Sequence, residues 1–144
     1  PVSKTYSKVL VKDFTSGPDS GADAAACLKF TGVVASEIMR TNPNTPVIRT
    51  GTPDSSTLVV GGEITRFVEG NAALRFLVGM GAGSSYFDAT VRATDGASGS
   101  SIATLSADKN SWGLGGSLAA GQTVYTFMDE AAKKTAKEVA PYLK

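Results

Sequence analysis

The feature that most constrains the fold is a change in hydrophobic spacing along the 144-residue chain. In the first third, apolar residues recur at helical intervals behind Asp23, a suitable N-cap. They predict a helix to about Arg40 with an inner stripe formed by Cys27, Phe30, Val34 and Ile38. From residue 58 onward the pattern changes to strand-like segments separated by short links. Links this short favour antiparallel hairpins, so the two halves predict different structures.

Further strand-like segments frame the predicted helix. Lys8–Phe14 precedes it and Pro46–Arg49 follows it, which gives a strand–helix–strand crossover. The second half is expected to contribute the strands Leu58–Glu69, Leu74–Met80, Ser85–Thr94 and Ser101–Asp108. Matching the apolar faces of the first two favours a three-residue loop, Gly70–Ala72, between them. A closing helix is expected from about Thr123 to Ala140.

These elements predict one domain spanning residues 1–144. Its fold class is α+β: a two-layer sandwich with a mixed, mostly antiparallel sheet of five or six strands and two helices on one face. The opposite face of the sheet must then be polar, covered by a loop or used for contact. The longest weakly charged run, Gly70–Phe87, is shorter than the ~20 apolar residues that a membrane-spanning helix needs.

Composition argues against several classes of function. Fourteen Lys and Arg against thirteen Asp and Glu give a net charge of +1, so binding to nucleic acid through bulk charge is not expected. The chain has no histidine, the commonest general base and metal ligand, and its single cysteine, Cys27, lies on the apolar stripe. Glu63, Glu69 and Asp88 could supply paired carboxylates, but charged residues on strands more often form solvated ion pairs. We therefore expect no catalytic residues, no cofactor and no metal.

The run Gly79-Met80-Gly81-Ala82-Gly83 invites a comparison with phosphate-binding loops. Such loops need a helix N-terminus directly after the glycines, whereas Ser84–Phe87 continues as a strand. A tight or bulged turn is the favoured interpretation. Binding of a small ligand or nucleotide at Gly79, Gly81 and Gly83 stays open as the least favoured alternative.

Two further residues stand out as candidates for contact with a partner. Arg75 lies in an otherwise apolar strand, where its ordinary role would be an ion pair on the outer face. Trp112, preceded by Ser111, is the only tryptophan and lies in a glycine-rich connection. It can either cover the sheet or anchor a partner. The predicted partner-binding residues are Arg75, Gly79, Gly81, Gly83, Ser111 and Trp112.

Several short motifs resemble a known family. They are Gly62-Glu63-Ile64, Gly70-Asn71-Ala72-Ala73-Leu74-Arg75, the Gly79–Gly83 run, Asp95-Gly96 and Ser111-Trp112. Together they resemble bacterial lipoproteins grouped as domain of unknown function 4410. The order of elements is also similar, at the level of fold, to the N-terminal domain of TolB and to lipoprotein activators of penicillin-binding proteins.

The resemblance implies a non-catalytic cell-envelope lipoprotein domain, on the periplasmic side or the surface of the outer membrane. Its lipid anchor would lie on a cysteine upstream of the domain, and its partner would be an envelope protein or a cell-wall component. Exposure at the surface would also make it a target for antibodies. The alternative from the residues themselves is a self-associating structural subunit, because an apolar edge such as Phe76-Leu77-Val78 can add strands from a neighbour. Such a protein would be a monomer or a weak homo-oligomer.

Overall fold

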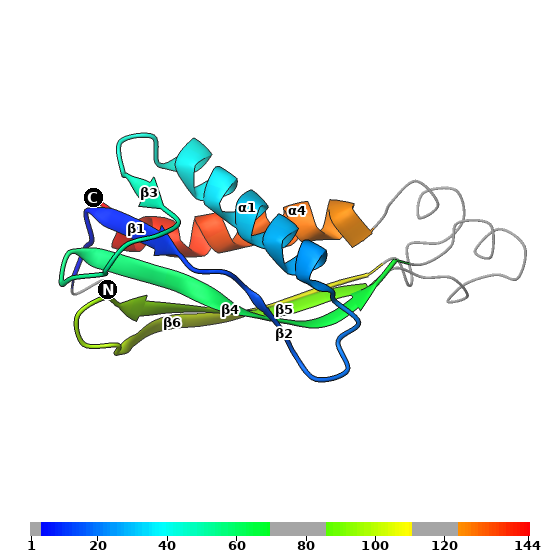
Figure 1. Cartoon of the computed structure of the whole chain (residues 1–144). Coiled ribbons are helices and arrows are strands. Elements are labelled where there is room, and N and C mark those ends of the chain that lie inside the picture. Colours follow the sequence, from blue (N-terminus) through cyan, green and yellow to red (C-terminus); the bar gives the residue numbers. More distant parts are fainter. Residues whose placement is uncertain (1–3, 70–85, 111–123) are drawn as a thin grey trace, which may run out of the picture.

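The computed structural model describes residues 4–69, 86–110 and 124–144. Two helices pack on one face of a six-stranded mixed sheet, which confirms the predicted α+β sandwich (Figure 1). The elements in chain order are β1 (Lys8–Val11), β2 (Thr15–Ser16), α1 (Ala24–Thr41), β3 (Val47–Ile48), β4 (Thr57–Val68), β5 (Tyr86–Asp95), β6 (Ser101–Asn110), α4 (Val124–Val139) and the 3₁₀ turn η1 (Ala140–Tyr142). The predicted strand Leu74–Met80 and the loop Gly70–Ala72 lie outside the described residues.

The sheet combines a parallel and an antiparallel half. Its strand order is β3-β1-β4-β5-β6, with β2 also paired to β4. The crossover through α1 makes β1 and β3 parallel, and β1 and β2 both run parallel to β4. The antiparallel pairs β4–β5 and β5–β6 extend over nearly the whole length of their strands. Strand β4 is therefore central, with parallel partners on one edge and an antiparallel partner on the other.

Local signals explain both helices. The side chain of Asp23 caps α1 by accepting a hydrogen bond from the Ala26 amide at 2.8 Å, as its position in the sequence predicts. Helix α4 ends at Val139, and Pro141 lies within the 3₁₀ turn that follows. Both helices turn apolar stripes toward the sheet, and they also pack against each other.

The predicted first strand is shorter in the structure. After β1 the chain leaves the ladder so that Phe14 can enter the core, and pairing with β4 resumes in β2. The Phe14 amide compensates by donating to Thr31 Oγ1 of α1 at 2.9 Å. The ring of Phe14 packs on Phe30, which in turn packs on Phe87 of β5, with centroid distances of 4.6 and 4.8 Å. Burial of rings of this size contributes roughly 1.5–3 kcal/mol each.

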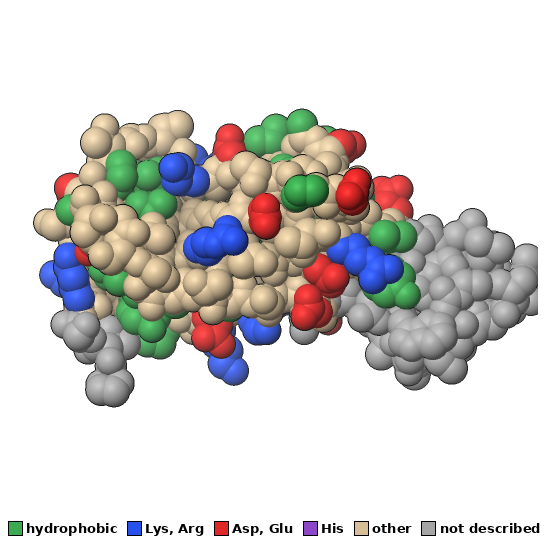
Figure 2. Space-filling view, turned by 90° about the horizontal axis from the view of Figure 1, so that it is seen from below, with side chains coloured by type: hydrophobic (Ala, Val, Ile, Leu, Met, Phe, Trp, Pro, Cys, Tyr) green, Lys and Arg blue, Asp and Glu red, His purple; other side chains and the backbone are tan. Residues whose placement is uncertain are grey.

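The sheet face turned away from the helices is polar. Side chains alternate along β5 and β6, so that Val91 and Ala107 face the core while Thr90, Arg92 and Ser106 face outward. Charged side chains of both signs are scattered over this face (Figure 2). At one end the Arg66 guanidinium lies over the ring of Tyr86, 3.7 Å from its centroid. Of the three possibilities left by the sequence, the described part of the face fits a polar surface.

Gly62 is a point of close approach in β4. Its φ is +145°, and an added Cβ would lie 2.0 Å from the Thr90 carbonyl oxygen of β5. The ladder shifts register a few residues later, between Ile64 and Arg66. A side chain at position 62 would thus be strained both by its backbone conformation and by the neighbouring strand.

We expect Gly62→Ala to lower the free energy of unfolding by about 2–4 kcal/mol, because backbone strain and overpacking add at this position. Chemical denaturation measures the change. Gly61→Ala is the matched control, since its Cβ would meet only the Lys12 Cβ at an ordinary 3.5 Å. Equal stability of the two variants would contradict this account of Gly62.

Candidate functional site

All six residues that the sequence singled out for partner binding lie in segments 70–85 and 111–123, outside the described residues. The described residues that flank these segments lie together. Val68 pairs with Tyr86, and Tyr86 pairs with Asn110. We call this end of the sheet the distal end, and the opposite end, where Leu58 pairs with Asp95, the proximal end. The site built by the described residues is at the distal end.

A pocket of about 460 Å³ opens at the distal end, between α1, α4 and the end of β4. We call it the Tyr125 pocket. It combines aromatic, acidic, basic and small residues: Gly21, Asp23, Ala25, Ala26, Lys29, Phe67, Glu69 and Tyr125. These residues are far apart in the sequence, and the packing of both helices on one face of the sheet brings them together.

Three contacts hold the Tyr125 side chain in place. Its hydroxyl donates to Glu69 Oε1 at 3.0 Å, and its ring meets the ring of Phe67 edge to face at a centroid distance of 6.0 Å. The Lys29 ammonium lies 5.6 Å from the ring centroid. The pKa of Tyr125 is raised, first by the hydrogen bond to Glu69 and then by burial and nearby carboxylates. Tyr125 therefore stays a neutral donor at physiological pH, although 39% of the residue is exposed.

The wall beside α1 depends on a tight turn before the helix. Gly21 has φ +85°, and a Cβ there would lie 2.7 Å from the Phe67 carbonyl oxygen. The Phe67 amide donates to the Ser20 carbonyl at 2.7 Å, so this turn pairs with the end of β4. Glycine at position 21 thus allows the start of α1 to lie directly beside Phe67.

The arrangement in the Tyr125 pocket is suited to binding. An exposed aromatic ring beside an ammonium and a carboxylate can stack on a flat or apolar group and hydrogen-bond its polar edges. The sequence identified Glu69 only as one of three possible carboxylates. The other two, Glu63 and Asp88, lie on the polar outer face of the sheet, where Asp88 pairs in register with Arg66. Lys29 and Tyr125 were missed, because neither belongs to a motif.

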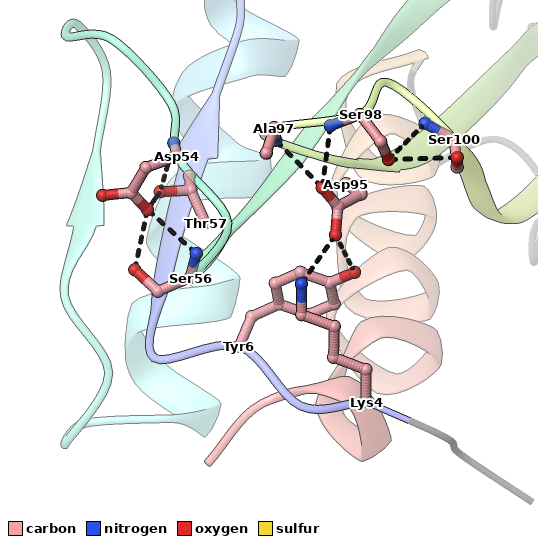
Figure 3. A network of polar contacts seen from close by, with 9 residues as sticks. All are labelled: Lys4, Tyr6, Asp54, Ser56, Thr57, Asp95, Ala97, Ser98 and Ser100. Atoms are coloured by element: carbon pink, nitrogen blue, oxygen red, sulfur yellow. Dashed lines mark hydrogen bonds and ion pairs between the residues drawn. The ribbon is translucent and has the colours of Figure 1, made fainter.

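A second polar cluster lies at the proximal end (Figure 3). Asp95 Oδ2 accepts from Lys4 Nζ at 2.9 Å and from the Tyr6 hydroxyl at 2.8 Å. Its Oδ1 accepts from the amides of Ala97 and Ser98 at 2.9 and 3.0 Å. The Ser98 amide, followed by Lys4 and Tyr6, holds the pKa of Asp95 well below its usual range. Burial, followed by the hydrogen bond to Asp95, raises the pKa of Tyr6 to about 12.

The neighbouring turn is organised in the same way. Asp54 accepts from both the hydroxyl and the amide of Ser56 and from the Thr57 hydroxyl, which lowers its pKa to about 2. Gly96, in the turn that follows Asp95, connects the two turns, because its amide donates to the Thr57 carbonyl at 2.9 Å. The carboxylates of Asp54 and Asp95 thus serve to close turns and attach the N-terminal segment, so we interpret this cluster as structural.

Cys27 and the remaining acidic residues do not form a metal site in the part of the chain that the structure describes. Cys27 is a buried free thiol whose pKa is raised by burial, as its place on the apolar stripe predicts. Within residues 4–69, 86–110 and 124–144, no group of three or more His, Cys, Asp or Glu side chains could hold a metal ion. In the same ranges, no helix has the length and apolar character that crossing a bilayer requires.

The Asp95 cluster predicts a loss of stability in acid. A carboxyl group with a lowered pKa in the folded state binds protons less readily than it does in the unfolded chain, where its pKa is about 3.9. Its contribution is complete above that value and is lost as the pH falls through the folded pKa. Asp95→Asn should flatten the fall in denaturation midpoint between neutral and acidic pH. Asp129→Asn on the exposed side of α4 is the control, and identical acid profiles for the two variants would refute the role of Asp95.

Among curated protein sequences none matches the chain. A dodecameric PelC from Paraburkholderia phytofirmans has the same fold, with a TM-score of 0.60 at 14% identity, over 100% of this chain and 93% of that one. A Xanthomonas campestris protein assigned to domain of unknown function 330 aligns with a TM-score of 0.55 at 9% identity, covering 96% of this chain and 90% of that one.

A third structure is a homologue of neuraminyllactose-binding hemagglutinin from Helicobacter pylori, with a TM-score of 0.51 at 10% identity, over 98% of this chain and 84% of that one. Similarity at these identities concerns the fold alone. The fold-level similarity to TolB and to activators of penicillin-binding proteins stays a prediction. The model of one sequence family, domain of unknown function 4410, matches residues 9–115. The chain therefore belongs to the family described as domain of unknown function 4410.

Proposed function

We propose that this domain is a non-catalytic binding module of the bacterial cell envelope, and that its distal end docks an envelope protein or another envelope component. The observation that carries the proposal is the Tyr125 pocket, where an exposed aromatic ring, an ammonium and a carboxylate converge on one opening. Aromatic anchors of this kind are common at binding surfaces, because they provide contact area at little cost in conformational entropy.

The two terminal segments lie at the proximal end, and this supports docking through the distal end. Tyr6 and Leu143 form a β-bridge at the proximal end, and Lys4 is held there by Asp95. Strand β5 has 10 residues, which separates the two ends of the sheet by about 30 Å. A tether on the N-terminal side would therefore leave the distal end accessible. An upstream lipid anchor, which the family resemblance implies, would fit this geometry.

Two other features are consistent with binding in place of catalysis. The chain contains no histidine, and the carboxylates of Asp54 and Asp95 in the proximal cluster are used in closing turns. A similar fold occurs in a homologue of neuraminyllactose-binding hemagglutinin, whose name refers to a binding protein, and this supports the proposal at the level of fold alone. If the purified domain turned over a substrate and a single substitution abolished that activity, the non-catalytic proposal would be contradicted.

Site-specific photo-crosslinking in intact cells tests the docking end. A photoreactive phenylalanine analogue at position 125 should give discrete cross-linked products, and the same analogue at Ser98, on the exposed proximal turn, should not. Lys29→Glu in the same chain should lower the yield of cross-linked products from position 125, because it reverses the charge beside the ring. Identical products from both positions, or none from position 125, would rule out docking at the distal end.

A second candidate function is self-association into a structural oligomer. The specific observation in its favour is that the PelC structure, which has this fold over the whole length of the chain, is a dodecamer. The apolar edge Phe76-Leu77-Val78, from which the sequence predicted self-association, lies outside the described residues. Nucleotide binding at Gly79, Gly81 and Gly83 lies there as well, and it stays a prediction.

A further inference from the structure

Helix α1 has a second apolar face, which points away from the core. Its buried stripe packs on the sheet and on α4. On the outer side, Leu28 is 56% exposed and Met39 is 46% exposed, both high values for large apolar side chains. With three small residues they form an uncharged surface along the helix, which we call the α1 stripe: Ala25, Leu28, Gly32, Ser36 and Met39. Helix α1 lies in the outer layer of the sandwich (Figure 1).

Gly32, at the centre of the α1 stripe, is not explained by packing against residues 4–69, 86–110 or 124–144. It lies in the middle of an 18-residue helix, where glycine is the poorest helix former after proline. Among the residues that the structure describes, a Cβ at this position would meet no atom within 4 Å. The missing side chain therefore makes no room for any described part of the same molecule. A glycine on an exposed helix face does allow close approach by the backbone of another molecule.

We propose that the α1 stripe is the surface through which two copies of this chain associate, with their α1 helices antiparallel across a two-fold axis at Gly32. The proposal rests on the second candidate function, self-association, and names its surface. A two-fold interface brings each residue opposite its mirror position along the helix. Leu28 and Ser36 lie four residues on either side of Gly32, and Ala25 and Met39 lie seven residues on either side.

This spacing makes the α1 stripe complementary to itself. Each large side chain faces a small one: Leu28 faces Ser36, Met39 faces Ala25, and the two Gly32 residues meet at the axis. The five residues of the stripe are uncharged, and the exposed residues Lys29 and Arg40 border the stripe on the side of Ser36. Large side chains set against small ones allow two helices to interdigitate at close distance. A second copy of the chain places a small residue opposite each large one, so the stripe itself specifies this partner.

The exposed edge of the sheet is a weaker candidate for self-association. At β6, the Lys134 ammonium of α4 donates to the Ser106 carbonyl at 2.8 Å and so occupies a backbone acceptor. Lysines placed in this way protect edge strands from pairing with another chain. One helix pair also buries less area than a standard interface, so we expect a weak and reversible association.

Sedimentation velocity over about three decades of protein concentration tests the proposal. The wild-type protein should shift from monomer to dimer or higher species as concentration rises. Gly32→Glu should stay monomeric while keeping its fold by circular dichroism, because a Cβ at position 32 would meet no described atom within 4 Å. Ser55→Glu, which adds the same charge in an exposed loop, should associate like the wild type.

The outcomes distinguish self-association itself from the α1 stripe as the surface proposed for it. A wild-type protein that is monomeric at every concentration would overturn both self-association and the α1 stripe. Association that Gly32→Glu leaves unchanged would overturn the α1 stripe alone. Gly32→Ala adds a test of close approach: it should raise the melting temperature at low concentration and yet weaken association, and unweakened association would contradict close packing at Gly32.

Disulfide trapping tests the register of the helix pair. Under mild oxidation Gly32→Cys should form disulfide dimers readily, because both copies of position 32 lie at the two-fold axis. Ser36→Cys should form far fewer, because it faces Leu28. The wild-type protein controls for Cys27, which is buried. Equal trapping at positions 32 and 36 would overturn the proposed register.

Discussion

The structure depends on β4 being hydrogen-bonded along both edges. One edge receives β1 and β2 in parallel, and the other receives β5 in antiparallel orientation. The crossover half and the hairpin half of the chain are joined only through this strand in the described sheet. Its inner residues Leu58, Val60 and Ile64 are fully buried under the helices. Any loss of β4 would thus divide the sheet between the two halves and expose the common core.

Strand β4 contributes to the polar cluster at one end of the sheet and to the pocket at the other. At its start, the turn of Asp54 packs beside the turn of Asp95, which in turn holds Lys4 and Tyr6. At its end, Phe67 and Glu69 form one wall of the Tyr125 pocket. The same strand therefore connects a cluster in which polar groups are satisfied internally with a pocket in which aromatic and charged groups are open to solvent. This asymmetry underlies the proposed docking at the distal end.

The fold could be predicted from the sequence to a large extent, because its strongest signals are local. The cap at Asp23, the buried stripe through Phe30 and Val34, and the short strands beside it all follow from spacing and turn chemistry. The break between β1 and β2 could not be predicted, because it depends on Phe14 reaching Phe30 and Phe87 across the layers. The conformation of Gly62 likewise depends on the neighbouring strand.

The candidate site was much less accessible to sequence reasoning. Glycine runs and a lone tryptophan drew attention to segments outside the described residues, whereas Lys29, Phe67 and Tyr125 come from three separate elements and share no motif. A weak signal did exist for the α1 stripe. Leu28 and Met39 are apolar residues off the buried stripe of a helix, and Gly32 lies between them. Only the exposed fractions of Leu28 and Met39 and the open space at Gly32 distinguish an outer face from ordinary packing.

The bridge between Tyr6 and Leu143 also has a topological consequence. The Tyr6 amide donates to the Tyr142 carbonyl at 2.7 Å, and the Lys144 amide donates to the Tyr6 carbonyl at 3.0 Å. The segments around Tyr6 and Leu143 thus run side by side in the same direction, like neighbouring parallel strands. A peptide that doubles back from one to the other could join them, and the ring so formed could be reopened in an exposed loop such as the one around Gly51. The architecture is therefore compatible with circular permutation, in which the order of the elements along the chain changes and their positions in space do not.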